Sequence, residues 1–121
     1  MSKILLVDDE QQLRSMLRIA LESAGHEVEE AGDGKEAIES YRSHPADLLV
    51  TDIVMPGQEG IETIMQFREK YPDLKIIAMS GAGRNTGQSY LDLAQKLGAN
   101  RTLAKPFSIE DFLAAVQGVL K

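Results

Sequence analysis

Short apolar runs rich in aliphatic residues alternate along this chain with longer segments of helical periodicity. Two of the runs are continuously apolar, as expected of central strands in a parallel sheet that is covered on both faces. Strand–helix units in series require right-handed crossovers, which place helices on both sides of the sheet. The alternation predicts an α/β fold of three layers, with a five-stranded parallel sheet and five helices. The expected strands are Ile4–Val7, His26–Ala31, Leu48–Thr51, Ile76–Met79 and Arg101–Ala104.

Helical patterns follow each of these runs. The first pattern ends at Gly25, where a left-handed C-terminal cap is expected, and the last begins after Ser108, a residue type favoured at the N-cap. We expect the intermediate helices at about residues 34–42, 59–70 and 87–97. The apolar positions of the first helix are Leu13, Met16, Leu17, Ala20, Leu21 and Ala24, and those of the last are Ile109, Phe112, Leu113, Val116 and Leu120.

Composition narrows the class of protein. A chain of 121 residues with 43% hydrophobic content is expected to form one domain over residues 1–121, with no room in it for an effector domain. The chain has no cysteine, which excludes disulfides and thiol chemistry and fits a cytoplasmic protein. No apolar run approaches the roughly 20 residues that span a bilayer, so we expect no membrane contact. The net charge of −6 and the scattered basic residues argue against direct nucleic-acid binding.

The expected strands carry polar residues at their carboxyl ends, where open parallel sheets place their functional crevice. Asp8 and Asp9 follow the first strand, Asp52 the third, Ser80 the fourth and Lys105 the fifth. Three nearby carboxylates repel one another unless a cation neutralises them, and all-oxygen ligands suit Mg²⁺. A lysine and a hydroxyl are suited to holding phosphoryl oxygens. One carboxylate is then available as a nucleophile toward phosphorus, giving an aspartyl phosphate.

Four segments in this order resemble the receiver domain of bacterial two-component response regulators. They are "ILLVDDE", "DLLVTDIVMPGQEG", "IIAMSG" and "LAKPF", and the resemblance covers essentially the whole chain. It implies a flavodoxin-like fold with strand order 2-1-3-4-5. It also implies a signalling phosphoacceptor rather than an enzyme, which receives a phosphoryl group from a sensor histidine kinase or a histidine phosphotransfer protein. A downstream target protein or a fused output domain would then read the switched surface.

The resemblance also assigns roles to individual residues. Asp52 corresponds to the phosphorylated residue, and Asp9 and Asp52 to direct Mg²⁺ ligands, while Asp8 acts on the ion mainly through water. The backbone carbonyl of Val54 is the remaining protein ligand. Ser80 and Lys105 correspond to the residues that bind the phosphoryl group, and the peptide bond from Lys105 to the next residue is expected to be cis. Met55-Pro56 and Gly60 correspond to the turn that shapes the loop after the phosphorylated residue.

Two positions depart from the family pattern. An aromatic residue usually precedes the lysine by three positions and swings inward on activation, but here this position is Thr102, which has no ring. The loop after Ser80 is longer than usual and contains glycines at 81, 83 and 87, so we expect high mobility from Gly81 to Gly87. The sequence of this loop does not match the pattern of a nucleotide-binding loop. It follows the fourth strand, lacks the Rossmann spacing and contains no Gly-Lys-Ser/Thr.

Other interpretations stay open at this point. Asp8, Asp9 and Glu10 also suit the N-terminus of a helix, where acidic side chains are stabilised by the helix dipole. His26 and His44 are expected to be exposed and inert, and Met16, Met65 and Met79 follow core spacing. At the level of function, the alternatives are a receiver-fold docking module with little phosphorylation-dependent switching and a flavodoxin-like cofactor binder, which would be yellow if it held flavin.

Overall fold

The computed structural model describes residues 2–53, 59–81 and 92–121. Its strands form one sheet in the order β2-β1-β3-β4-β5, and every neighbouring pair is parallel. This order confirms the one predicted from the family resemblance. The strands are β1 (Lys3–Val7), β2 (Glu27–Ala31), β3 (Leu48–Asp52), β4 (Lys75–Ser80) and β5 (Arg101–Ala104), and the helices are α1 (Gln11–Ser23), α2 (Gly34–Ser43), α3 (Glu59–Lys70) and α5 (Ile109–Leu120); residues 92–96 are also helical.

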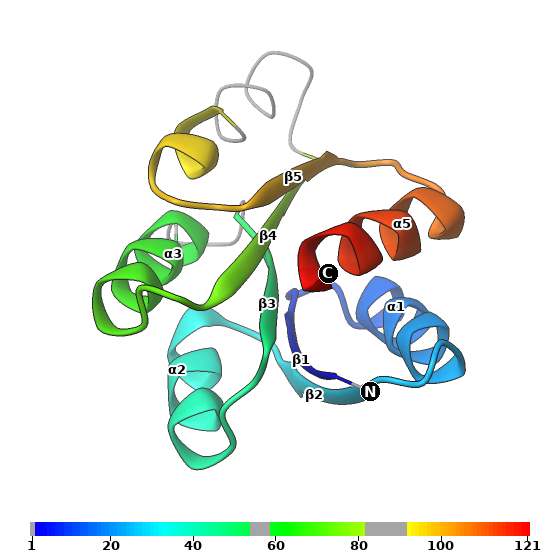
Figure 1. Cartoon of the computed structure of the whole chain (residues 1–121), viewed down its shortest axis with the longest axis horizontal. Coiled ribbons are helices and arrows are strands. Elements are labelled where there is room, and N and C mark those ends of the chain that lie inside the picture. Colours follow the sequence, from blue (N-terminus) through cyan, green and yellow to red (C-terminus); the bar gives the residue numbers. More distant parts are fainter. Residues whose placement is uncertain (1, 54–58, 82–91) are drawn as a thin grey trace.

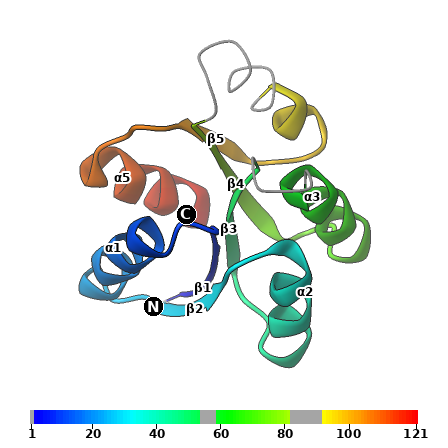
Figure 2. The ribbon, with the colours of Figure 1, turned by 180° about the vertical axis from the view of Figure 1, so that it is seen from behind.

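Helices cover both faces of the sheet, which gives the three predicted layers. Figures 1 and 2 show α1 and α5 side by side on one face, and α2 and α3 on the other. Successive strand residues point to opposite faces, so Leu5 and Val7 belong to the core under α2 and α3, while Ile4 and Leu6 belong to the core under α1 and α5. Residues in the middle of these strands are therefore buried whichever face they point to, which explains the apolar runs Ile4–Val7, Leu48–Val50 and Ile76–Met79.

The helix ends follow the expected capping chemistry. Gly25 adopts a φ of 94°, the left-handed conformation predicted for the end of α1. At the start of α5 the Ser108 hydroxyl accepts a hydrogen bond from the Asp111 backbone N–H at 3.0 Å. The Asp33 carboxylate caps α2 in the same way, accepting from the Glu36 N–H at 2.8 Å. These caps satisfy backbone groups that a helix end otherwise leaves without partners.

The outer strand β2 has a different composition from the central strands. Only Val28 and Ala31 of its residues are buried, and the others are glutamates. Charged side chains on an edge strand oppose pairing with a second copy of the chain.

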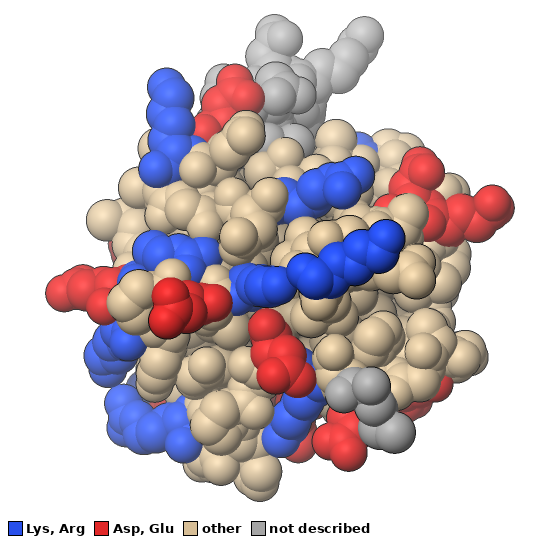
Figure 3. Space-filling view, viewed as in Figure 1, with Lys and Arg blue, Asp and Glu red and all other residues tan. Residues whose placement is uncertain are grey.

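The molecular face shown in Figure 3 carries a mixture of positively and negatively charged side chains. No helix in the described part of the chain is long and apolar enough to cross a membrane.

Two of the methionines expected in the core lie at the surface. Met79 is fully buried on β4, but Met16 on α1 and Met65 on α3 are 49% and 50% exposed. The prediction was wrong for both helical residues. Residue spacing identifies the apolar side of a helix, but positions at the margin of that side are buried only if a neighbouring element reaches them.

Candidate functional site

The carboxyl ends of four parallel strands bring the predicted site residues to one edge of the sheet. Asp8 follows the last residue of β1, while Asp52 and Ser80 are themselves the last residues of β3 and β4, and Lys105 follows β5. The strand register holds these ends level, because Asp52 pairs with Met79 and Ser80 with Ala104. The topology thus brings together residues that lie up to 97 positions apart in the chain.

Three carboxylates gather at this edge. Asp8, Asp9 and Asp52 each offer an oxygen that lies within 4.8 Å of the other two. Asp8 is fully buried, Asp52 is 5% exposed, and Asp9 is exposed to solvent. Buried carboxylates need cationic or hydrogen-bonding partners to remain charged. The cluster therefore combines oxygen ligands of the kind that Mg²⁺ prefers with access for water through Asp9.

Lys105 joins two of the acidic residues. Its ammonium lies 2.9 Å from Asp8 Oδ2 and 3.2 Å from Asp52 Oδ2, and its side chain is 17% exposed. Burial disfavours the charged ammonium, but the hydrogen bond that it donates to Asp8 and the negative charge of Asp52 outweigh this cost and raise the pKa of Lys105. Lys105 therefore carries a full positive charge beside Asp52 at neutral pH.

Asp8 is held by hydrogen bonds at every polar atom. Its N–H donates to the Ala31 carbonyl at 3.2 Å, and its Oδ1 accepts from the Glu10 N–H at 2.9 Å. Its carbonyl oxygen accepts from Arg14 Nη1 at 2.6 Å, while Oδ2 faces Lys105. Glu10 itself is the N-cap residue of α1, and its side chain forms no capping hydrogen bond. Among the three consecutive acidic residues, Asp8 is therefore the one whose side chain stabilises the turn between β1 and α1. The Asp8 carboxylate also supplies an oxygen to the acidic cluster.

The Ser80 hydroxyl has a different environment. Ser80 is 2% exposed, and its Oγ has no hydrogen-bond partner within the described ranges. A buried hydroxyl without a partner is costly, and native structures rarely keep one without a reason. The Ser80 hydroxyl is therefore available, at this edge of the sheet, to donate or to accept a hydrogen bond.

The family model of the response regulator receiver domain matches residues 4–117 of the chain. The chain belongs to this family. Response regulator MprA of Mycobacterium ulcerans is 37% identical to the receiver domain over 119 residues, which cover 98% of this chain and 50% of MprA. The alkaline phosphatase synthesis transcriptional regulatory protein PhoP of Bacillus subtilis is 33% identical over 119 residues, with coverages of 98% and 48%. The receiver domain thus spans about half the length of these curated relatives.

Solved structures confirm the fold. Chemotaxis protein CheY4 of Vibrio cholerae matches the receiver domain with a TM-score of 0.87 at 32% identity, and the match covers 99% of each chain. The receiver domain of NtrX from Brucella abortus matches with a TM-score of 0.90 at 26% identity, covering 97% of each chain. The receiver-type fold predicted from the sequence is therefore the fold of this chain.

The receiver domain needs glycine at position 60 because α3 begins against the end of β3. A Cβ on Gly60 would lie 2.6 Å from the Asp52 carbonyl oxygen and 2.5 Å from the Ile53 carbonyl carbon, and closer still to Ile53 Cα. These are backbone atoms that cannot rotate away. Val54, predicted to supply a carbonyl ligand, lies outside the described residues together with Met55-Pro56.

Gly81 contacts the stem of Lys105. A Cβ at this position would lie 2.8 Å from Lys105 Cβ and 3.1 Å from its Cδ. The Lys105 N–H also donates to the Ser80 carbonyl at 2.8 Å, and the Lys105-Pro106 peptide bond is cis, as predicted. Gly81 therefore makes room for the lysine, a role that its sequence context did not indicate. The remaining positions of the predicted mobile stretch, 82–87, lie outside the described residues.

Position 102 lacks the aromatic ring of the usual receiver domain. Thr102 is half-buried on β5, in register with Ala78 of β4. Its neighbour Leu103 packs into the core under α1 and α5; because side chains alternate along a strand, Thr102 faces the opposite side of the sheet. A threonine there has two small γ-substituents, so no ring can rotate between buried and exposed positions.

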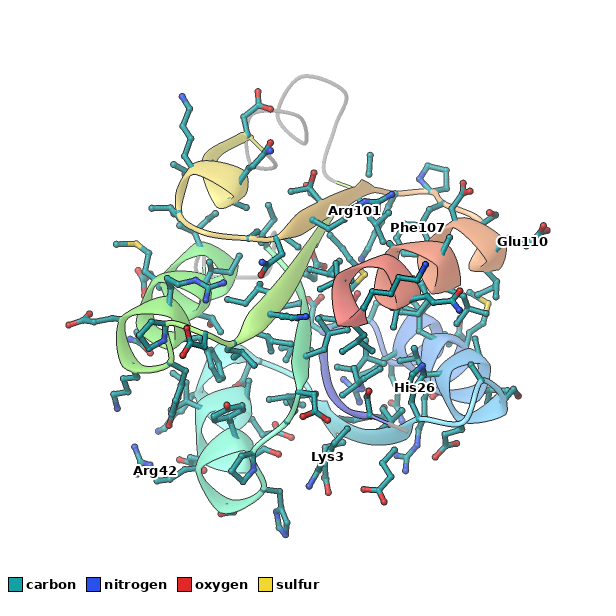
Figure 4. All side chains as sticks on the ribbon, viewed as in Figure 1. Lys3, His26, Arg42, Arg101, Phe107 and Glu110 are labelled. Atoms are coloured by element: carbon teal, nitrogen blue, oxygen red, sulfur yellow. The ribbon has the colours of Figure 1, made fainter. Side chains whose placement is uncertain are left out.

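The two histidines differ from each other. His44 at the end of α2 is exposed, as expected. His26, labelled in Figure 4, lies in the turn between α1 and β2 and is half-buried, with its Nδ1 enclosed and lacking a partner in the described structure. The expectation of an exposed His26 was wrong, because the residue is only partly accessible to solvent.

One cavity in the described part of the chain borders the predicted site, and another lies away from it. The first, of about 420 Å³, lies beside Lys105 between α1 and the segment leading to α5. Phe107, labelled in Figure 4, lines this cavity, and its ring stacks on that of Phe112 with the centroids 5.7 Å apart. The other, of about 400 Å³, lies between α2 and α3, and no predicted site residue lines it. The first cavity therefore gives access to the site from solvent. Its lining residues are Glu10, Leu13, Met16, Gly81, Lys105, Pro106 and Phe107.

Proposed function

We propose that Asp52 accepts a phosphoryl group from a phosphohistidine of a sensor histidine kinase or a histidine phosphotransfer protein. The observation that carries this proposal is the contact of Lys105 with both Asp52 and Asp8. It joins a buried carboxylate nucleophile, a fixed positive charge and a second acidic side chain at one point. Family membership supports the same role, since the chain matches the receiver model across this region.

The residues present fit a Mg²⁺ ion. Asp8, Asp9 and Asp52 supply carboxylate oxygens within 4.8 Å of one another, and one ammonium does not neutralise three negative charges. In the proposed arrangement Asp9 and Asp52 bind the ion directly, Asp8 acts mainly through water, and the Val54 carbonyl completes the protein ligands. When bound, Mg²⁺ supplies positive charge that neutralises the oxygens of the transferring phosphoryl group.

The chain's own residues perform the remaining steps. A carboxylate oxygen of Asp52 attacks phosphorus, an O–P bond forms and the P–N bond of the phosphohistidine breaks. The electron pair of that bond stays on the imidazole. The Lys105 ammonium, 3.2 Å from Asp52, lies where it stabilises phosphoryl oxygens. The Ser80 hydroxyl donates to another phosphoryl oxygen and so acquires the partner that it lacks in this structure.

The phosphorylated domain acts as a signalling phosphoacceptor, which assists its own phosphoryl transfer but is not an enzyme in the ordinary sense. Phosphorylation shifts an existing conformational equilibrium at the surface around residues 92–96, β5 and α5. A downstream target protein or a fused output domain reads this surface, with no direct nucleic-acid or membrane contact. We assign residues 1–121 to this one receiver domain, acting in the cytoplasm.

A second candidate function keeps the fold but reduces the switch. Thr102 favours it, because the ring that normally reports phosphorylation is absent from β5. In this alternative the domain docks to its partner in either state. The affinity for the partner, measured before and after phosphorylation, separates the switching function from the docking function. A change in affinity much above about tenfold requires a coupling free energy of over 1 kcal/mol between the phosphorylation site and the partner surface, and would rule out the docking function.

The direct test is incubation with a small-molecule phosphoryl donor and Mg²⁺, followed by intact-mass measurement. We expect one phosphate on the wild-type chain and none on Asp52→Asn. Asp73→Asn is the matched control, because Asp73 is an exposed aspartate in the turn before β4, at the opposite end of that strand from Ser80. Equal labelling of wild type and Asp52→Asn would refute the assignment.

A further inference from the structure

Two arginines on α1 share one acidic partner, but only one of them also contacts the turn after β1. Arg18 forms a second, exposed ion pair instead, from its Nε to Glu22 Oε2 at 3.1 Å. Arg14 Nε and Arg18 Nη1 each lie 2.7 Å from a different oxygen of Glu30 on β2. Only Arg14 also reaches the acidic turn, where its Nη1 donates to the Asp8 carbonyl oxygen at 2.6 Å. The Arg14 side chain is 17% exposed and that of Arg18 is 40% exposed.

The Asp8 carbonyl is the point at which the chain leaves β1. Asp9 is the next residue, and its carboxylate is the exposed member of the acidic cluster. A hydrogen bond from a charged donor to this carbonyl fixes the peptide plane between the two aspartates. Glu30 in turn holds the guanidinium in place, so the orientation of both aspartates depends on a contact that reaches across to the edge strand.

We propose that Arg14 is a positioning residue for the metal site and that Glu30 anchors it. The inference rests on the proposed function, since it concerns the same Mg²⁺ site. Arg14 touches neither the ion nor the phosphoryl group. It orients the turn that presents Asp8 and Asp9, as groups behind metal ligands commonly do.

The experiment is calorimetric titration of the unphosphorylated chain with Mg²⁺ at a temperature where circular dichroism shows every variant folded. We expect Arg14→Gln to bind Mg²⁺ about tenfold more weakly than wild type, the lower end for loss of a supporting contact. Arg18→Gln is the matched control. It loses the same Glu30 partner from the same helix, together with the exposed pair to Glu22, but no contact with Asp8. Its Mg²⁺ affinity should stay within about twofold of wild type, because exposed ion pairs contribute little.

A second readout separates positioning from a general loss of structure. In phosphorylation by a small-molecule donor, Arg14→Gln should raise the Mg²⁺ concentration for half-maximal rate while the rate at saturating Mg²⁺ approaches that of wild type. An unchanged half-saturation value overturns the inference. If Arg14→Gln does not fold, Glu30→Gln takes its place, and Mg²⁺ affinity equal to that of Arg18→Gln overturns the inference.

The outcomes for the metal site and for Arg14 are distinguishable. If the wild-type chain binds no Mg²⁺, the proposed metal site and the role of Arg14 fail together. If wild type and Arg14→Gln bind Mg²⁺ equally, only the role of Arg14 fails and the proposed function stands.

Discussion

Lys105→Met tests whether the lysine neutralises the acidic cluster. Methionine keeps an unbranched side chain against Gly81 but removes the ammonium from Asp8 and Asp52. At an effective dielectric constant of about 20, contacts of 2.9 and 3.2 Å correspond to gross attractions of about 6 and about 5 kcal/mol. Desolvation of the ammonium cancels much of this. Because the lysine is 17% exposed, we expect a net loss of about 2 to 4 kcal/mol, near the lower end for breaking a buried pair.

The assay is urea unfolding near neutral pH, followed by circular dichroism, in the presence of a chelator. Lys75→Met serves as the control, because the hydrogen bond of the Lys75 ammonium within the described ranges is a long one, 3.5 Å to the Lys121 carbonyl oxygen. Mg²⁺ should then narrow the difference between Lys105→Met and wild type. An ion at 100 times its dissociation constant adds about 2.7 kcal/mol, and Lys105→Met, which lacks the competing ammonium, should bind it more tightly.

The result that would refute this reasoning is a Lys105→Met protein as stable as wild type in chelator. The three carboxylates would then tolerate one another without the lysine. A stability loss that Mg²⁺ does not reduce would instead count against the cluster as an ion site, because an ion held by the same oxygens should relieve the same repulsion.

Two further predictions concern packing and pH. Gly60→Ala should lower the free energy of unfolding by about 1–3 kcal/mol, because the added Cβ meets backbone atoms of Asp52 and Ile53. The control is Gly118→Ala on α5, where the added Cβ would lie 3.5 Å from Arg101 Nη1; this change should be neutral or stabilising in the same urea assay. Equal effects of the two substitutions would contradict the close packing at Gly60. The pKa of Lys105 is raised above 10.5, so its contribution to stability is complete below that value and is lost as pH rises through the folded-state pKa. The contribution of Lys105 to the stability difference between wild type and Lys105→Met should therefore be constant from about pH 7 to about pH 9 and shrink only above pH 10.5. If the free energies of unfolding of the two proteins converge at lower pH, the raised pKa of Lys105 is contradicted.

The sequence was sufficient to predict the fold because its local signals agree with one another. The continuously apolar runs Ile4–Val7 and Ile76–Met79 require cover on both faces. Gly25 and Ser108 mark helix ends with the conformation and the hydrogen bond that were expected. The same topology explains why the juxtaposition of Asp8, Asp52 and Lys105 was predictable. Parallel strands end at one edge, so residues that follow them must meet there.

Contacts made by side chains across elements were not predictable in this way. Arg14 and Arg18 lie one helical turn apart, and nothing in a single sequence distinguishes the one that reaches the Asp8 carbonyl. The partial burial of His26 was not predicted from its position beside a turn either. The roles of Asp9 and Val54 as ligands remain predictions, Val54 because it lies outside the described residues.

The unpartnered hydroxyl of Ser80 has a consequence for the balance between the two states of the domain. Among the described residues this buried hydroxyl has no hydrogen-bond partner, and an unsatisfied buried polar group costs about 1–3 kcal/mol. Under the proposed function this cost disappears once a phosphoryl oxygen accepts its hydrogen bond. Relief of a cost of that size would favour the phosphorylated conformation by about 5- to 150-fold. A single buried oxygen atom would then supply much of the bias that an aromatic ring at position 102 cannot.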